Sequence, residues 1–91
     1  MTEPSFTLQI LTPRKKVFSG QVTSLVAPGE LGYLGILSNH APLVTPLAPG
    51  KVTFRDAGGA TQTLISAAGG LLEVWRNTAT LLADEISSPR A

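Results

Sequence analysis

Residues 51–66 decide the fold, and in one-letter code they read KVTFRDAGGATQTLIS. Val52 and Phe54 share one face of this stretch and polar residues occupy the other, which is the period-two pattern of a half-buried strand. The Asp-Ala-Gly-Gly run at 56–59 is a hairpin turn signal, and residues 61–66 supply the returning strand. The sequence therefore predicts a β-hairpin in the middle of the chain.

The same pattern extends from this hairpin toward both ends of the chain. Nine glycines and seven prolines are spread along the whole length. They interrupt the apolar runs at roughly the 8–12-residue spacing of a sandwich or barrel. No stretch keeps the 3.6-residue period of an amphipathic helix. The other predicted strands are 6–11, 16–20 and 22–27 before the hairpin, and 71–75 and 78–83 after it.

The segments between and beyond these strands are expected to be irregular. Two glycines and a Ser-Asn pair divide residues 29–43 into short pieces. The stretch around Pro46 is expected to be irregular or at a sheet edge, because proline lacks the ladder N–H. Residues 84–91 show little periodicity and are expected to fray. The chain is thus predicted to be a single all-β domain over residues 1–84, followed by a short C-terminal tail over 85–91.

Composition restricts the classes of function. A chain of 91 residues forms one domain with a modest core. Charged residues make up only 14% of it, against an ordinary share of about a quarter. This favours a surface partly covered by partner proteins, and a thermally robust β protein is the alternative. The net charge is +1 and the basic residues are scattered, so nucleic acid is not expected as a partner.

The sequence has no cysteine and no apolar segment of membrane-spanning length, which restricts its possible cross-links, metal sites and membrane contacts. The chain has no cysteine, which excludes disulfides and thiolate metal sites. No apolar run approaches the roughly 20 residues of a membrane span. The first residues, Met1 to Pro4, include an acid and lead into no apolar segment, so they do not begin a secretory signal. Membrane association is therefore expected only indirectly, through a protein complex.

Few residues suggest chemistry. His40 is the only histidine. A zinc site needs more nitrogen or sulfur ligands than one histidine supplies, and His40 lacks the sequence neighbours of a Ser-His-Asp triad. We expect it to organise a turn through a hydrogen bond to the backbone, with a contact to a partner protein as the alternative. Gly29, Gly32 and Gly35 fit neither the dinucleotide nor the Walker pattern, and we expect them to supply positive φ angles or bulges. Trp75 is expected to pack in the core or against a turn, with an interface role second.

The acidic residues form no pair suited to hydrolysis, which would also need a cleft. They are expected to be solvated residues of turns: Glu30, Asp56, Glu73, Asp84 and Glu85. No catalytic residue, cofactor site or metal site is therefore predicted.

Residues 32–43, GYLGILSNHAPL, resemble the signature of the epsilon subunit of the F-type ATP synthase, called delta in mitochondria. The family pattern is G-x-x-G-[IV]-x-x-x-H-A-P-L. Three further pieces agree in order along the chain: the opening strand and hairpin at 11–20, the Pro49-Gly50 pair, and the closing strands at 68–74 and 80–84. The resemblance covers about residues 5–85 without a large gap.

This resemblance implies a small, flattened, ten-stranded β-sandwich or barrel on the central stalk of the enzyme. There the family binds the gamma subunit, rests on the ring of c subunits and turns with the rotor, helping to couple proton or sodium flow to ATP synthesis. Catalysis lies on the alpha/beta hexamer, so this chain is expected to be non-catalytic and to need no cofactor. Its expected location is the periphery of an energy-transducing membrane, at the cytoplasmic face of a bacterial cytoplasmic membrane.

The resemblance also implies two docking surfaces. The loop that faces the c ring in the family corresponds here to Glu30, Leu31, Gly32 and Tyr33. Tyr33 stands where some relatives carry an acidic residue, so this contact is expected to be more apolar. The face toward gamma corresponds to Thr12, His40, Ala41, Pro42, Leu43 and Thr45.

One departure from the family is large. Its members usually continue into a C-terminal helical hairpin, which extends along gamma to inhibit ATP hydrolysis and in some members binds ATP. This sequence stops at Ala91, and the methionine at position 1 favours a naturally short subunit over a truncated one. We therefore expect no inhibition by a helical switch. The alternatives are a free-standing β-sandwich module that binds a protein or ligand in an apolar pocket, and a small enzyme, which the residue inventory disfavours.

Overall fold

The computed structural model describes residues 3–88, which form nine β-strands and no helix that could cross a membrane. The strands are β1 (Phe6–Leu11), β2 (Lys16–Gly29), β3 (Gly32–Ile36), β4 (Leu43–Leu47), β5 (Gly50–Asp56), β6 (Thr61–Ser66), β7 (Gly70–Trp75), β8 (Thr78–Ala83) and β9 (Ile86–Ser87). The predicted all-β fold is confirmed, with nine strands among these residues where the resemblance implied ten.

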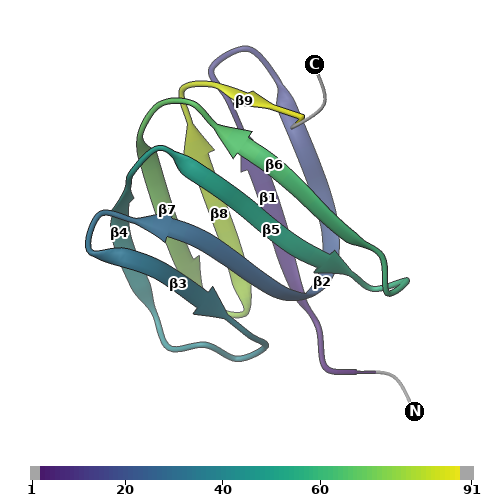
Figure 1. Cartoon of the computed structure of the whole chain (residues 1–91). Helices are drawn as coiled ribbons and strands as arrows, with labels where there is room; N and C mark the ends of the chain where they lie inside the picture. The colour runs from purple at the N-terminus through teal and green to yellow at the C-terminus, as the bar shows by residue number, and fades with distance from the viewer. Residues whose placement is uncertain (1–2, 89–91) are drawn as a thin grey trace.

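The strands lie in two layers that share β2 (Figure 1). The front layer has the order β3-β2-β5-β6-β9, and the rear layer has the order β1-β8-β7-β4. β2 belongs to both, because its first half pairs with β1 and its second half with β5 and β3. At its end, Gly29 also pairs with Leu47 of β4. The strands β1, β8, β7, β4 and β2 therefore close into a ring.

β2 is longer than the sequence predicts. Separate strands over 16–20 and 22–27 are wrong, because Lys16–Gly29 form one strand of 14 residues. The strand changes partners where its register against β5 shifts, between Val22 and Ser24. If the two halves of β2 were counted separately, the nine described strands would become the ten that the resemblance implied.

Gly20, the predicted end of a strand, lies within β2 and does not turn the chain. A side chain built on it would meet the ring of Phe18 at 3.3 Å. That ring packs against Phe54, with the two ring centroids 4.5 Å apart. Gly20 therefore makes room for the packed rings of Phe18 and Phe54. The positions of glycines in the sequence do not by themselves predict this contact.

The core lies between the two layers and follows the predicted alternation. In β1, β5 and β8, buried residues alternate with more exposed ones. Fully burying one large apolar side chain contributes about 1.5–3 kcal/mol, so this alternation fixes which face of each strand turns inward. The buried apolar residues are Phe6, Leu8, Ile10, Val22, Leu25, Ala27, Ile36, Leu47, Val52, Phe54, Leu72, Val74, Ala79, Leu81 and Ala83.

Two segments without a predicted strand contain one: the first was expected to be irregular, and the second was expected to be irregular or at a sheet edge, of which the edge is observed. Gly32–Ile36 form β3, antiparallel to β2. Pro46 lies within β4 and pairs with Leu71 of β7. Only the last residue of β4, Leu47, pairs with β2, so Pro46 occupies a largely open edge, where its missing N–H costs no ladder bond.

The predicted frayed tail is wrong for two of its residues. Ile86 and Ser87 form β9 and pair with Ser66 and Ile65 of β6. Ile86 also packs against the core, which gives this short strand an apolar anchor. Residues 89–91 of the predicted tail lie outside the described residues.

Candidate functional site

The outer surface of the rear layer carries a row of apolar side chains. Pro46, Leu71, Leu82 and Leu11 lie opposite one another on the neighbouring strands β4, β7, β8 and β1. Each directly follows or precedes a more buried residue in its strand, so its side chain points away from the core. Leu82 is 43% exposed at the centre of the row. We call these four residues the apolar row, and a contiguous outward patch of this kind is a candidate surface for a partner.

The apolar row is extended at both ends. Beside Leu11, the surface is hollowed between Thr12, Pro13 and Asp84. On β4, Val44 points outward two residues from Pro46 and is 62% exposed. The apolar surface therefore reaches from one edge of the rear layer to the other.

Trp75 lies at the end of β7 and is more than half exposed. The guanidinium of Arg76 sits 5.3 Å from the centroid of its ring, a cation–π arrangement. Of the two places predicted for Trp75, the core is therefore wrong, and the ring contacts the following turn. Its exposed side adds an amphipathic aromatic surface to the lower end of the rear layer.

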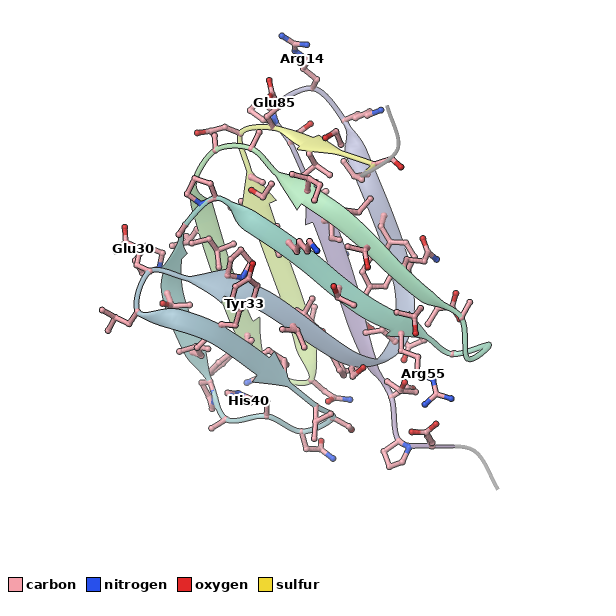
Figure 2. All side chains as sticks on the ribbon, viewed as in Figure 1. Arg14, Glu30, Tyr33, His40, Arg55 and Glu85 are labelled. Carbon is pink, nitrogen blue, oxygen red and sulfur yellow. The ribbon has the colours of Figure 1, made fainter. Side chains whose placement is uncertain are left out.

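The residues predicted to face the c ring begin at the turn between β2 and β3. Glu30 and Leu31 form this β2–β3 turn, and the side chain of Leu31 is fully exposed. Gly32 follows with a φ of 134°, a conformation that side chains rarely adopt. Figure 2 shows Glu30 at the outer end of the sandwich, away from the other labelled residues. The turn therefore projects an apolar side chain into solvent at the tip of the domain.

Tyr33 is oriented differently from the turn that precedes it. Its hydroxyl accepts a hydrogen bond from the backbone N–H of Lys51 at 3.0 Å. Figure 2 shows the side chain lying across the front layer toward β5. A side chain at Gly50 would collide with the Tyr33 hydroxyl and with Pro28, so the small residue there accommodates the tyrosine. The structure thus divides the predicted surface into a projecting turn and a fixed aromatic ring.

The β2–β3 turn is joined to the rear layer by backbone hydrogen bonds. The N–H of Glu30 donates to the carbonyl of Pro46 at 3.3 Å, and the N–H of Ala48 donates to the carbonyl of Pro28 at 2.8 Å. Pro46 is itself a member of the apolar row. The turn predicted to face the c ring and the apolar row are therefore parts of one backbone network.

His40 organises the turn after β3, as predicted. Its N–H donates to the carbonyl of Leu37 at 3.2 Å, and its Nδ1 lies 2.7 Å from the carbonyl oxygen of Ala41. Ala41 and Pro42 are exposed in the connection that leads to β4. Figure 2 shows His40 on the lower side of the domain, beneath β3.

The remaining residues predicted to face gamma lie at opposite edges of the rear layer. Leu43 packs against the core, and Thr45 shares its inward side of β4. Val44 and Pro46 are the residues that β4 presents outward. At the far edge, the Thr12 hydroxyl accepts bonds from the N–H groups of two residues of the β1–β2 connection, each at 3.3 Å. The apolar row spans the distance between these two groups.

The apolar row is what sequence reasoning missed. Leu71 and Leu82 belong to predicted strands, and the alternation within each strand indicates that they share the outward face. Their alignment with Pro46 and Leu11 depends on the register between four strands, including the parallel pair β1–β8. No local motif encodes that register.

The charged residues build no reactive centre among residues 3–88. They contain no group of three His, Asp or Glu side chains that could hold a metal ion. The Asp56 carboxylate accepts bonds from the Ala60 N–H at 3.0 Å and from the Gln62 amide at 3.3 Å, which is the turn role predicted for it. Glu3 lies 3.6 Å from Arg55 in an exposed pair, an interaction that contributes little.

Only one of three glycines predicted to have positive φ or to form bulges has a positive φ, namely Gly32. Position 29 requires glycine for a different reason, because a side chain there would meet the carbonyl oxygen of Gly32 at 2.8 Å. Around Gly35 there is open space. Gly29 and Gly32 therefore serve the hairpin at the tip of the domain, whereas nothing around Gly35 requires a glycine.

The family described as the ATP synthase delta/epsilon chain beta-sandwich domain matches residues 5–89. The chain belongs to this family. The resemblance seen in residues 32–43 is thereby confirmed, and the apolar row lies on the surface of an epsilon-chain β-sandwich.

Curated relatives named ATP synthase epsilon chain agree. The protein of Dichelobacter nodosus is 44% identical over 80 residues, which are 88% of this chain and 55% of the relative. The protein of Pelotomaculum thermopropionicum is 43% identical over 84 residues, or 92% of this chain and 61% of the relative. The protein of Chlorobaculum tepidum is 42% identical over 86 residues, or 94% of this chain and 97% of the relative. This epsilon-chain domain thus spans little more than half of the first two relatives and nearly all of the third.

Two solved structures share the fold. A chain of the Euglena gracilis mitochondrial ATP synthase, in a structure of OSCP, F1 and c-ring, matches with a TM-score of 0.87 and 19% identity over 97% of this chain and 56% of that chain. A chain of the Tetrahymena thermophila mitochondrial ATP synthase central stalk and c-ring matches with a TM-score of 0.78 and 18% identity over 97% and 69%. Both matches show the same fold at low sequence identity.

Proposed function

We propose that residues 3–88 are the docking domain of a central-stalk subunit of the ATP synthase rotor. The outer surface of the rear layer binds the gamma subunit along the apolar row, and the β2–β3 turn meets the c ring. The domain is non-catalytic and helps to couple ion flow to ATP synthesis. Its place is the periphery of an energy-transducing membrane, at the cytoplasmic face of a bacterial cytoplasmic membrane.

The observation that carries this proposal is the apolar row on a member of the epsilon-chain family. Leu71 and Leu82 sit at its centre, while Glu73 and Thr80 form a polar border on the same surface. An apolar centre with a polar rim is the usual anatomy of a protein interface, and about 800 Å² per partner is an ordinary size. The few residues whose truncation costs about 2 kcal/mol or more of binding free energy cluster near the centre of such patches.

The connection between the two surfaces supports a role in carrying torque. The hydrogen bond from Glu30 to Pro46 ties the turn to the apolar row. A force applied at the turn therefore passes into the rear layer through the backbone rather than through mobile side chains. This docking role requires no helix, and residues 3–88 contain none.

The gamma contact is tested by titration calorimetry of the purified chain with recombinant gamma subunit. Leu82→Lys places a charge at the centre of the apolar row, and Val26→Lys is the control. Val26 is 41% exposed against 43% for Leu82, but it lies on the outer surface of the front layer. We expect Leu82→Lys to weaken binding by about 30-fold or more, which corresponds to about 2 kcal/mol. Val26→Lys should change the Kd less than threefold.

Circular dichroism establishes that each variant is folded before it is titrated. If the folded parent does not bind gamma, the rotor assignment is wrong and the free-standing module takes its place. If Val26→Lys weakens binding as much as Leu82→Lys, gamma does not dock on the rear layer.

The c-ring contact is tested with the complex of gamma and this chain, added to purified c rings in lipid nanodiscs. Leu31→Glu changes the tip of the β2–β3 turn, and Ala57→Glu changes an equally exposed hairpin, β5–β6. We expect Leu31→Glu to weaken c-ring binding by about tenfold, because it replaces an apolar contact by a charge to be desolvated. Equal binding by the two variants would show that the turn does not meet the ring.

A further inference from the structure

β3 is an unprotected edge of the front layer. Among the described strands it pairs with β2 alone, and Figure 1 shows it as the outermost strand of that layer. Natural proteins usually protect such an edge with proline, charge or a bulge. Gly32–Ile36 contain no proline and no charged residue, and their register against β2 has no shift. The edge is therefore open to another strand.

The direction of the free backbone groups follows from β2. Pro28 lies opposite Tyr33, and the Pro28 carbonyl accepts from Ala48, on the side of β2 away from β3. Backbone groups alternate sides along an antiparallel strand. Leu34 therefore bonds to β2, whereas the N–H and C=O groups of Tyr33 and Gly35 point to the free edge.

We propose that a second copy of this chain docks on this edge, with the two β3 strands antiparallel and Leu34 opposite Leu34 of the second copy. Tyr33 of each copy then lies opposite Gly35 of the other. The outward N–H and C=O groups of these two residues form four ladder hydrogen bonds across a two-fold axis. The result is one continuous sheet made of two front layers.

The register is chosen by the side chains beside the edge. Continued one residue beyond each end of β3, it brings Leu31 of the β2–β3 turn, which is fully exposed, beside Leu37, which is 63% exposed. Gly35 has open space where a side chain would stand, so the second copy meets no obstacle there. The ring of Tyr33 stays on its own front layer, where its hydroxyl accepts from the Lys51 N–H. A shift by two residues in either direction leaves Leu31 or Leu37 without an apolar neighbour. One register therefore covers both exposed leucines.

The charges do not oppose this pairing. Residues 31–37 are uncharged, and the net charge of the chain is only +1. In the proposed register Glu30 lies opposite Ser38, so no like charges meet. An edge-to-edge contact of this length is small, in the class of transient complexes. We therefore expect a weak dimer, with a Kd on the order of 10–100 µM.

The dimer has a consequence for assembly that rests on the proposed function. Leu31 belongs to the turn assigned to the c ring, and in the dimer it is covered by the second copy. Dimer formation and c-ring docking therefore exclude each other, whereas the apolar row stays accessible. The unassembled chain protects its open edge by pairing with itself and exposes that edge again on dilution.

The first test is sedimentation velocity of the parent chain from about 5 µM to 1 mM. Leu37→Lys places a charge opposite Leu31, and Val44→Lys is the control because Val44 is 62% exposed on the rear layer. We expect the parent and Val44→Lys to dimerise equally, and Leu37→Lys to raise the Kd at least tenfold. A parent that stays monomeric at 1 mM, or a Leu37→Lys variant that dimerises like the parent, overturns the proposal. So does loss of the dimer in Val44→Lys.

The second test measures the register by disulfide cross-linking, since the chain has no cysteine of its own. Leu31→Cys and Leu37→Cys are prepared separately and oxidised alone or mixed. In the proposed dimer, position 31 of one copy faces position 37 of the other. Two copies of position 31 are about 20 Å apart, beyond the roughly 7 Å between Cα atoms that a disulfide spans. A covalent dimer formed only in the mixture is expected, and one formed by either variant alone overturns the register.

The same variants separate this proposal from the gamma assignment. Leu37→Lys should bind gamma like the parent, because Leu37 lies off the apolar row. If gamma binding fails for every chain, including the parent, the proposed function fails while the dimer tests stand unchanged.

Discussion

Replacing Gly70 by alanine tests how closely β7 approaches β8 beneath the apolar row. Gly70 begins β7 and pairs with Leu47 of β4 on one side and Ala83 of β8 on the other. A methyl group built on it would overlap the carbonyl of Leu82 and come within 3.0 Å of the Cα of Ala83. Both obstacles are backbone, which does not move aside as a flexible side chain does.

The size of the effect follows from two opposing terms. Forcing one extra carbon into a closely packed site costs about 1–3 kcal/mol or more, and backbone obstacles place this site at the upper end. Restricting the unfolded chain returns about 0.4–1 kcal/mol. We expect a net loss of about 2 kcal/mol, which lowers the Tm of a domain of this size by about 8–16 °C.

Thermal and urea unfolding followed by circular dichroism measure this loss, with Gly35→Ala as the matched control. Gly35 also lies in a strand, but it has open space where the methyl would stand and no positive φ. Alanine there should raise stability by about 0.5 kcal/mol, because only the unfolded-state term remains. If Gly70→Ala melts at or above the parent temperature, the close approach of β7 to β8 is wrong.

Asn77→Ala should destabilise the domain by about 1–3 kcal/mol. The Asn77 amide donates to the Ser5 carbonyl at 3.0 Å, and its Oδ1 accepts from the Asn39 N–H at 2.7 Å. Asn77 also has a φ of 59°, which alanine adopts less readily. Asn77→Gly removes the two hydrogen bonds but relieves the backbone, so urea unfolding should place it between the parent and Asn77→Ala; equal stability of the two variants would show that φ contributes nothing. Tyr33→Phe should cost about 0.5–1 kcal/mol, since it removes only the acceptor for the exposed Lys51 N–H. A loss above about 2 kcal/mol in the same assay would mean that the ring itself is misplaced.

Much of the fold could be predicted because β-structure is encoded locally. The alternation of Val52 and Phe54 and the following glycine-containing turn predict the β5–β6 hairpin as it is observed. The parts that could not be predicted depend on contacts distant in sequence. Gly20 resembles a strand end until the ring of Phe18 is seen to occupy the space above it, and Ile86 forms a strand because β6 offers it an edge.

The candidate site was predictable only in outline. The family signature located the β2–β3 turn and the turn of His40, which are continuous segments. It did not distinguish Leu43, which faces the core, from Val44, which faces outward, because that choice is set by the pairing of β4 with β7. The members of the apolar row lie on four different strands and are separated from one another in the sequence.

The parallel pairing of β1 with β8 has a consequence for the synthesis of the chain. Thr7 pairs with Thr78, so β1 can complete its pairing only after β8 has been synthesised. While the polypeptide leaves the ribosome, β1 finds β2 early, but its other edge stays bare until residues 78–82 emerge from the exit tunnel. Such distant pairings make folding slow. The surface spanning β1 and β8 is therefore completed only after translation of the domain, and no nascent fragment offers it to a partner.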